Sequence, residues 1–181
     1  MVKRIALVLL AIVVLASPAT AQDFSSLDVS FGYGNYGVED MGSGSTSVTT
    51  DRVHGFAMHT TFNLMSWLGL ENFTGAYALN NDVTLITNTF GAKLIARDVL
   101  EGRISPYLAG GIGVGYYTSN QTGGGFSTMA ARYGGGIDFN LNGGMAIRVD
   151  VGSLAMGSGL FTNGWRSNLN VTTGIVFNLG G

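Results

Sequence analysis

The chain is poor in charge and lacks cysteine. None of its 181 residues is cysteine, which excludes disulfides and thiol chemistry. Only 11% are Asp, Glu, Lys or Arg, whereas soluble domains average about 25%. No basic patch is present, so no nucleic-acid partner is expected. The hydrophobic content of 46% nevertheless argues against disorder, so the chain is expected to bury or shield a large apolar surface.

The first residues have the pattern of an export signal. Lys3 and Arg4 precede an apolar run over residues 5–16, and Ala19-Thr20-Ala21 supplies a small-x-small cleavage motif. An uncleaved anchor helix is the alternative, but twelve apolar residues are too few to span a membrane. We therefore expect residues 1–21 to be a cleaved signal peptide, with cleavage between Ala21 and Gln22, and residues 22–181 to form one domain. Removing the peptide leaves seven basic residues against eleven acidic ones, a net charge of −4. An exported chain with so little charge would be badly solvated in water, which indicates lipid.

Period-two alternation dominates the remaining sequence. In LDVSFGYGNY, apolar Leu27, Val29 and Phe31 alternate with small or polar residues, as in a strand with two unlike faces. Eight segments are predicted as strands, over residues 27–36, 52–63, 68–77, 85–97, 104–117, 128–139, 145–152 and 168–179. The third is irregular, because Phe73 and Tyr77 share parity with Glu71. A bulge or a shifted boundary is expected there.

The connections between these segments also alternate. Short links at residues 65–67, 98–103 and 140–144 alternate with mostly longer links rich in Gly, Ser, Thr and Asn, at 37–51, 78–83, 118–125 and 154–166. This arrangement is typical of an eight-stranded antiparallel up-and-down transmembrane β-barrel, whose strands cross a membrane in about 9–11 residues. An even strand number places both termini in the periplasm.

A soluble lipocalin-like barrel would show the same period with its apolar face inward. Such a barrel needs one strand face charged enough for water, whereas here the polar face is mostly Gly, Thr and Asn. The composition therefore favours an outward apolar face against lipid and a small polar lumen. Aromatic residues near the strand ends are expected to form interfacial girdles, namely Tyr33, Tyr36, Tyr116, Tyr117, Phe139 and Phe177.

A small set of ionisable residues falls on the inward face. Unpaired charges in so narrow an interior would be costly, so these side chains are expected to pair into a structural network that plugs the lumen. The alternative is that they contact only trapped water. If the hairpin turns near Asn142, Gly134 lies opposite Asp150 and Gly136 lies opposite Arg148. The predicted network contains Glu71, Lys93, Arg97, Arg132, Asp138, Arg148 and Asp150.

Two stretches carry a resemblance to a known family. ISPYLAGGIGVGYY, from Ile104, and YGGGIDFNLNGGMAIRVDVGSL, from Tyr133, resemble the small outer-membrane barrels of the OmpA-like, OmpX-like and opacity types. The resemblance spans essentially the whole mature chain and implies the outer membrane of a Gram-negative-type envelope. It implies contact with lipid or lipopolysaccharide and with the outer-membrane insertion machinery during assembly. Such proteins usually end in an aromatic residue, whereas here Phe177 lies four residues before the end.

No catalytic, metal or cofactor site is predicted. His54 and His59 lie on opposite faces of one strand, so they cannot serve a single metal or substrate. Barrels resembling PagL deacylate lipid A through a late His-x-Ser pattern, and no histidine follows His59 here. The sequence favours a structural or surface protein that is not an enzyme. The alternatives are a narrow passive channel for small or hydrophobic solutes, as in OmpW-like barrels, and a lipid A-modifying enzyme. No surface ligand is identified.

Overall fold

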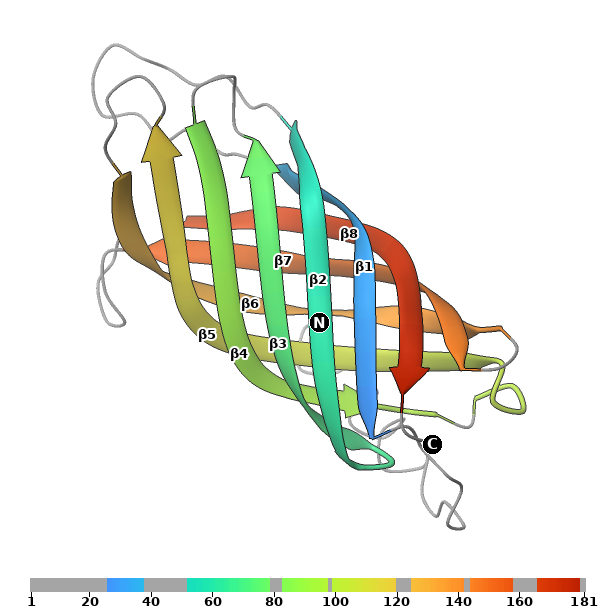
Figure 1. Cartoon of the computed structure of the whole chain (residues 1–181). Helices are drawn as coiled ribbons and strands as arrows, with labels where there is room; N and C mark the ends of the chain where they lie inside the picture. Colours follow the sequence, from blue (N-terminus) through green and yellow to red (C-terminus); the bar gives the residue numbers. More distant parts are fainter. Residues whose placement is uncertain are drawn as a thin grey trace, which may run out of the picture.

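The computed structural model contains a closed barrel of eight antiparallel strands (Figure 1). It describes residues 26–37, 52–78, 83–97, 99–119, 125–141, 144–157 and 166–179, without the side chains of Val83, Ser119, Phe126 and Arg166. The strands are β1 (Leu27–Gly37), β2 (Arg52–Met65), β3 (Leu68–Ala78), β4 (Val83–Ile95), β5 (Ile104–Ser119), β6 (Gly125–Asn140), β7 (Met145–Gly157) and β8 (Arg166–Leu179). Each strand pairs with its sequence neighbours, and β8 pairs with β1. The predicted fold class is confirmed.

The barrel has two unlike ends. Strands β2 and β3, β4 and β5, and β6 and β7 are joined at the end that we call the turn end; the longer connections leave the opposite, loop end. Leu100, Glu101 and Gly102 all have positive φ in the β4–β5 turn, and Gly144 has φ of 86° in the β6–β7 turn. Within the described residues, no helix is long and apolar enough to cross a membrane.

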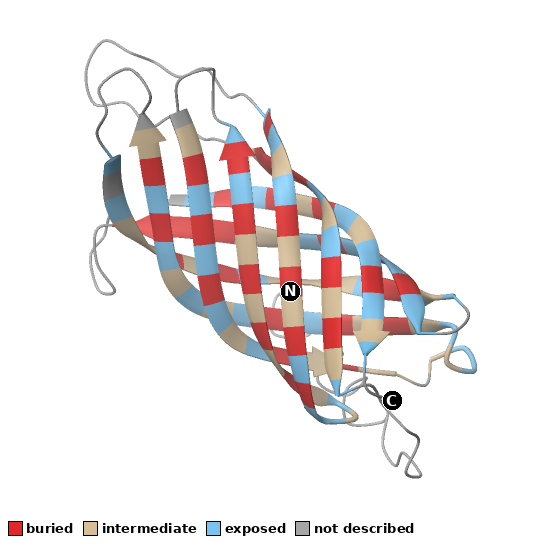
Figure 2. Cartoon of the chain, viewed as in Figure 1, coloured by how far each residue is buried: buried red, intermediate tan, exposed pale blue. Residues whose placement is uncertain are grey.

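Inward and outward residues alternate along the strands, as bands of buried and exposed residues around the barrel (Figure 2), except over residues 154–157 of β7, which are all buried. Phe31, Phe56, Phe90, Ile112 and Val114 are each more than half exposed on the outward face. Their neighbours along the strands point inward. The predicted outward placement of large apolar side chains is therefore confirmed at these positions, whereas the inward face holds large aromatic residues as well as small and polar ones.

Strand β3 departs from this pattern without the predicted bulge. Phe73 and Tyr77 are buried on the inward face together with Glu71, and β3 pairs regularly with β4 from end to end. The register shift instead falls where Asn63 and Met65 of β2 pair with β3 near the turn end. The bulge prediction was wrong because large aromatic side chains occupy the lumen at these positions.

The girdle prediction was wrong for two of its six residues. Tyr36 and Tyr117 are 0% and 5% exposed, so both point into the barrel. Tyr33, Tyr116, Phe139 and Phe177 are 38–48% exposed on the outward face. A tyrosine near a strand end can occupy either face, and its parity within the strand, fixed by the sheet, decides which.

Inward-facing glycines allow neighbouring strands of the barrel to approach each other closely. Gly91 of β4 lies opposite Gly111 of β5, and a Cβ at Gly91 would collide with the carbonyl oxygen of Gly110. Gly110 itself points outward, where the nearest atom to an added Cβ is 3.7 Å away. Glycine is therefore required at position 91 by the backbone of the adjacent strand.

A polar cluster interrupts the apolar outward face halfway along β3 and β4. The Asn72 Nδ2 donates to Asn88 Oδ1 at 3.2 Å, and Asn88 Nδ2 donates to Asn72 Oδ1 at 3.3 Å and to Thr74 Oγ1 at 2.8 Å. Asn72 Nδ2 also lies 3.4 Å from the Thr89 carbonyl oxygen. These amides therefore satisfy one another without solvent, which is what an apolar environment demands.

Candidate functional site: the polar lumen

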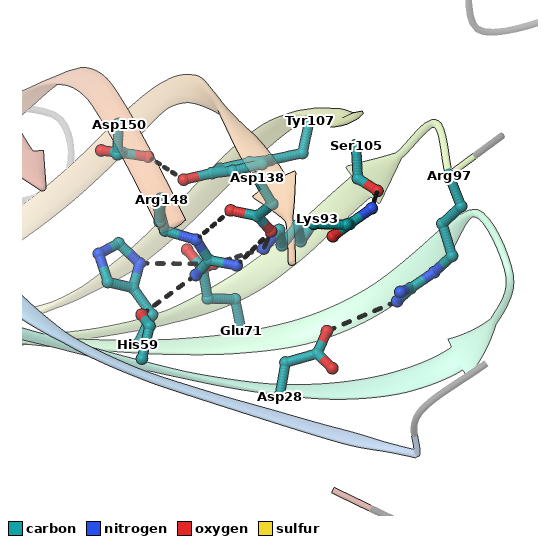
Figure 3. A network of polar contacts seen from close by, with 12 residues as sticks. Asp28, His59, Glu71, Lys93, Arg97, Ser105, Tyr107, Asp138, Arg148 and Asp150 are labelled. Carbon is teal, nitrogen blue, oxygen red and sulfur yellow. Dashed lines mark hydrogen bonds and ion pairs between the residues drawn. The ribbon is translucent and has the colours of Figure 1, made fainter. Parts of the chain in front are cut away.

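Six of the seven ionisable residues predicted for the lumen lie together at the centre of the barrel. Figure 3 labels all of them except Arg132. All six are buried, and four strands supply them, because inward positions at one height come from successive strands of a closed sheet. β3 supplies Glu71, β4 supplies Lys93, β6 supplies Arg132 and Asp138, and β7 supplies Arg148 and Asp150.

The strongest pair in the lumen joins β6 to β7. Asp138 and Arg148 lie directly opposite each other, and the guanidinium donates from Nε to Oδ1 and from Nη2 to Oδ2, both at 2.7 Å. This bidentate geometry is the strongest arrangement available to an arginine and a carboxylate. Arg148 Nη1 also donates to Ser30 Oγ at 3.2 Å, and Lys93 Nζ lies 3.8 Å from Asp138 Oδ2.

The predicted register of this hairpin was wrong by two residues. Gly136, rather than Gly134, lies opposite Asp150, and Asp138 rather than Gly136 lies opposite Arg148. The turn lies one residue further along the chain than Asn142, and Leu141 N donates to the Met145 carbonyl at 2.8 Å to close it. A shift of two preserves which face each residue occupies, so the inward set is unchanged.

Arg132 links two carboxylates on opposite sides of the lumen. Its Nη1 donates to Glu71 Oε1 at 3.0 Å and its Nη2 to Asp150 Oδ1 at 2.5 Å. Glu71 Oε2 lies 3.5 Å from His59 Nδ1 and 3.8 Å from Lys93 Nζ. Arg132 and Arg148 therefore both contact carboxylates directly, and neither depends on trapped water alone for a partner.

Aromatic rings complete the network at positions that the alternation pattern did not single out. The Tyr107 hydroxyl donates to Asp150 Oδ2 at 2.7 Å, and Lys93 Nζ lies 3.9 Å from the centre of the Tyr107 ring. The guanidinium of Arg132 lies 4.5 Å from the centre of the Phe73 ring. The faces of these rings carry partial negative charge, which further stabilises buried cations. The inward parity of Phe73 beside Glu71 was the sequence signal for this contact.

Arg97, the seventh predicted residue, lies apart from the central network. Its Nη2 is 3.5 Å from Asp28 Oδ2 and its Nε donates to the Ser66 carbonyl at 2.9 Å, near the turn end (Figure 3). Asn63 Nδ2 donates to the same Asp28 oxygen at 2.8 Å. Sequence reasoning missed Asp28, although its inward parity was evident. With it, the lumen holds four carboxylates and four Lys or Arg side chains in ion pairs.

A second, mainly apolar layer fills the lumen toward the loop end. Tyr36 and Tyr77 pack with ring centres 5.3 Å apart, and Tyr117 donates to the sulfur of Met156 at 3.1 Å. The hydroxyls of Tyr36 and Tyr77 accept hydrogen bonds from two asparagine amides of β8, at 2.7 and 2.8 Å. This aromatic layer, to which Val53, Leu85, Ala130 and Leu154 also belong, was not predicted as part of the lumen.

The arrangement offers ion pairing and packing but no reactive constellation. His59 points inward and His54 outward, as predicted, so they do not share a site. Among the described residues, no group of three or more His, Asp or Glu side chains is placed to hold a metal ion. The predicted cleavage site at Ala21 and Gln22 lies outside the described residues.

A closed eight-stranded barrel with an apolar outer surface and a charged, filled interior defines a transmembrane β-barrel. The family described as the outer membrane protein beta-barrel domain matches residues 6–177, and the chain belongs to that family. Its location is therefore the bacterial outer membrane. Comparison with curated proteins finds no match.

Several solved structures share the fold. The chain is similar to Neisserial surface protein A (NspA), with a TM-score of 0.68 and 9% identity, over 87% of this chain and 100% of the other. It is also similar to Ail, the attachment invasion locus protein of Yersinia pestis, with a TM-score of 0.54 and 15% identity, over 86% and 99% of the two chains. A third similar structure is the outer membrane protein OprG of Pseudomonas aeruginosa, with a TM-score of 0.55 and 13% identity, over 86% of this chain and 96% of the other. At these identities the likeness shows the fold alone.

Proposed function

We propose that this protein is a structural and surface protein of the outer membrane whose barrel conducts no solute. The observation that carries the proposal is the continuous filling of the lumen. The central ion-pair network and the aromatic layer lie one above the other, and Arg148, Lys93, Tyr36 and Tyr77 are each at most 2% exposed. Eight strands enclose an interior just wide enough for side chains, and the burial of these residues supports a lumen without an aqueous path.

The network plugs the lumen because its charges are balanced and held from opposite walls. Glu71 and Asp150 face each other across the barrel and are joined through Arg132, while Asp138 and Arg148 join adjacent strands. Opening a path would separate these pairs in an enclosed space, where an uncompensated charge costs several kcal/mol. The plug therefore also cross-links the strands.

Planar-bilayer recording of the refolded protein tests this role. The wild-type barrel should insert without discrete conductance steps. Small reproducible openings are expected from a triple variant that removes side chains from both layers. In this variant Tyr36 and Tyr77 are changed to alanine and Arg132 is changed to serine. Reproducible openings from the wild type would contradict the plug and favour a narrow passive channel instead. Mass spectrometry of lipid A, with and without the protein, tests enzyme activity, for which no change in acylation is expected.

The proposal includes an orientation and an assembly route. Both termini lie in the periplasm, and the loop end faces outward for surface contacts. The signal peptide is removed after Ala21 and the outer-membrane insertion machinery folds the barrel. Phe177 points outward in the last strand, 38% exposed, where that machinery could read it in place of a terminal aromatic. The intact mass of the mature protein tests the cleavage of the signal peptide. The orientation is tested on whole cells, by measuring whether protease reaches an epitope tag inserted in the 38–51 connection.

A further inference from the structure

The charges on the outward face are distributed unevenly. Every carboxylate in the described strands, at Asp28, Glu71, Asp138 and Asp150, points into the barrel. In β2, by contrast, Arg52 and His54 are exposed on the outward face next to the loop end. No carboxylate of the described residues forms an ion pair with Arg52. Arg52 therefore places on the outer wall a guanidinium that no carboxylate of the described strands neutralises, and such a cation attracts anions.

The imidazole of His54 is held in a defined position by β1. Asn35 lies directly opposite His54, and its Nδ2 is 3.2 Å from His54 Nδ1. The Tyr33 hydroxyl also contacts Nδ1, and its ring stacks on the imidazole with centres 5.5 Å apart and planes at 24°. Because the Asn35 Nδ2 group can only donate, Nδ1 accepts, and in the neutral imidazole the ring hydrogen then resides on Nε2. His54 thereby offers one positioned N–H donor.

Arg52 lies two residues from His54 on the same face of the strand, about 7 Å along it. Its partner across the β1–β2 pair is Gly37, which has no side chain to fill the space beside the guanidinium. The guanidinium supplies several donors in a planar fork that matches the oxygens of a phosphate group. Arg52 and His54 together can therefore donate to one phosphate from two directions.

Below this pair the surface becomes apolar. Phe56, the next outward residue of β2, is 78% exposed, and it lies opposite Tyr33, which is 48% exposed. A ligand that bound here would have its anionic part at Arg52 and His54 and an apolar part along these two rings. That combination is found in a phosphorylated lipid and is absent from free phosphate.

We propose that Arg52 and His54 bind the phosphate of an outer-leaflet glycolipid headgroup, with Tyr33 and Asn35 positioning the imidazole. The acyl chains of the same lipid lie against Phe56 and Tyr33. The site rests on the proposed orientation, in which the loop end faces the outer leaflet. It would anchor the barrel at a fixed depth and give its outer rim a bound shell of glycolipid.

Native mass spectrometry of the refolded barrel with added lipid A carrying two phosphates measures this binding. Arg52→Gln should weaken lipid A binding about fivefold, since each basic residue near a lipid surface contributes to the affinity for anionic lipid. The double variant, which also carries His54→Gln, should weaken this binding by more than about tenfold. Arg103→Gln is the matched control, because Arg103 is also exposed but lies at the turn end. It should leave binding unchanged.

Two further ligands identify the source of the phosphate. Dephosphorylated lipid A should bind the wild type as weakly as lipid A binds the double variant. Inorganic phosphate at equal concentration should not compete. Equal binding of the phosphorylated and dephosphorylated lipids, equal binding by wild type and double variant, or full competition by inorganic phosphate would each overturn the proposal. The conductance of the barrel should not respond to these substitutions, so failure of this site leaves the plug proposal standing.

Discussion

Neutralising Asp138 should strongly destabilise the barrel. Asp138→Asn removes the carboxylate that accepts two hydrogen bonds from Arg148 at 2.7 Å and lies 3.8 Å from Lys93. The amide that replaces it brings its own N–H donors toward two cations. Because Arg148 is only 2% exposed, water cannot compensate its charge. Removing one partner of a buried pair costs about 3–5 kcal/mol, and we expect a loss in that range.

A second substitution separates the pair from the rest of the network. Arg148→Met removes the unpaired guanidinium, so the double variant should recover at least about 2 kcal/mol of the summed single losses. Arg97→Gln is the matched control: the side chain of Arg97 is 22% exposed, and Asp28 keeps its hydrogen bond from Asn63. It should cost under about 1 kcal/mol.

The measurement is reversible urea unfolding in lipid vesicles, followed by tryptophan fluorescence and by the electrophoretic shift between folded and unfolded bands. The free energies of unfolding of the wild type, the two single variants and the double variant form one double-mutant cycle, and Arg97→Gln is measured beside it as the control. If Asp138→Asn lost no more stability than Arg97→Gln, or if the two single losses simply added, the network would not act as a structural plug.

Three further predictions concern the wall of the barrel. Asn72→Leu should lower the free energy of unfolding by about 1–3 kcal/mol because it removes the donor to Asn88 Oδ1 and leaves that oxygen against lipid, whereas changing both asparagines to leucine should restore the stability. Equal losses in the single and double variants would contradict the pairing. Gly91→Val should prevent folding, seen as the absence of a heat-modifiable gel band, while Gly110→Ala should fold normally; a folded Gly91→Val barrel would refute the close approach of β4 and β5. Val149→Arg, on the outward face, should cost about 2–4 kcal/mol in vesicle unfolding if the residue lies near the bilayer midplane, and no cost would argue against lipid contact there.

The fold could be predicted because alternation is a local property of the sequence. A strand in a closed barrel must present one face to lipid and one to the lumen, so each residue's side follows from its parity. Phe31 and Phe90 outside, and Glu71 and Lys93 inside, needed no further information. The prediction of a bulge in β3 was wrong because it used the same local pattern. Phe73 shares the inward face with Glu71, which looks like a break in the alternation in the sequence alone. The structure explains the inward aromatic, because the Arg132 guanidinium lies over the Phe73 ring.

Which lumen residues meet depends on contacts between strands far apart in the sequence. Glu71 and Arg132 are separated by 61 residues, and no local pattern joins them. Even within one hairpin, moving the turn by one residue changed the partner of Arg148 from Gly136 to Asp138. The sequence by itself determined the number of strands, the face of nearly every residue and the supply of buried charge. Only the closed sheet decided the pairing of those charges, because register and curvature arise from hydrogen bonds that connect all eight strands at once.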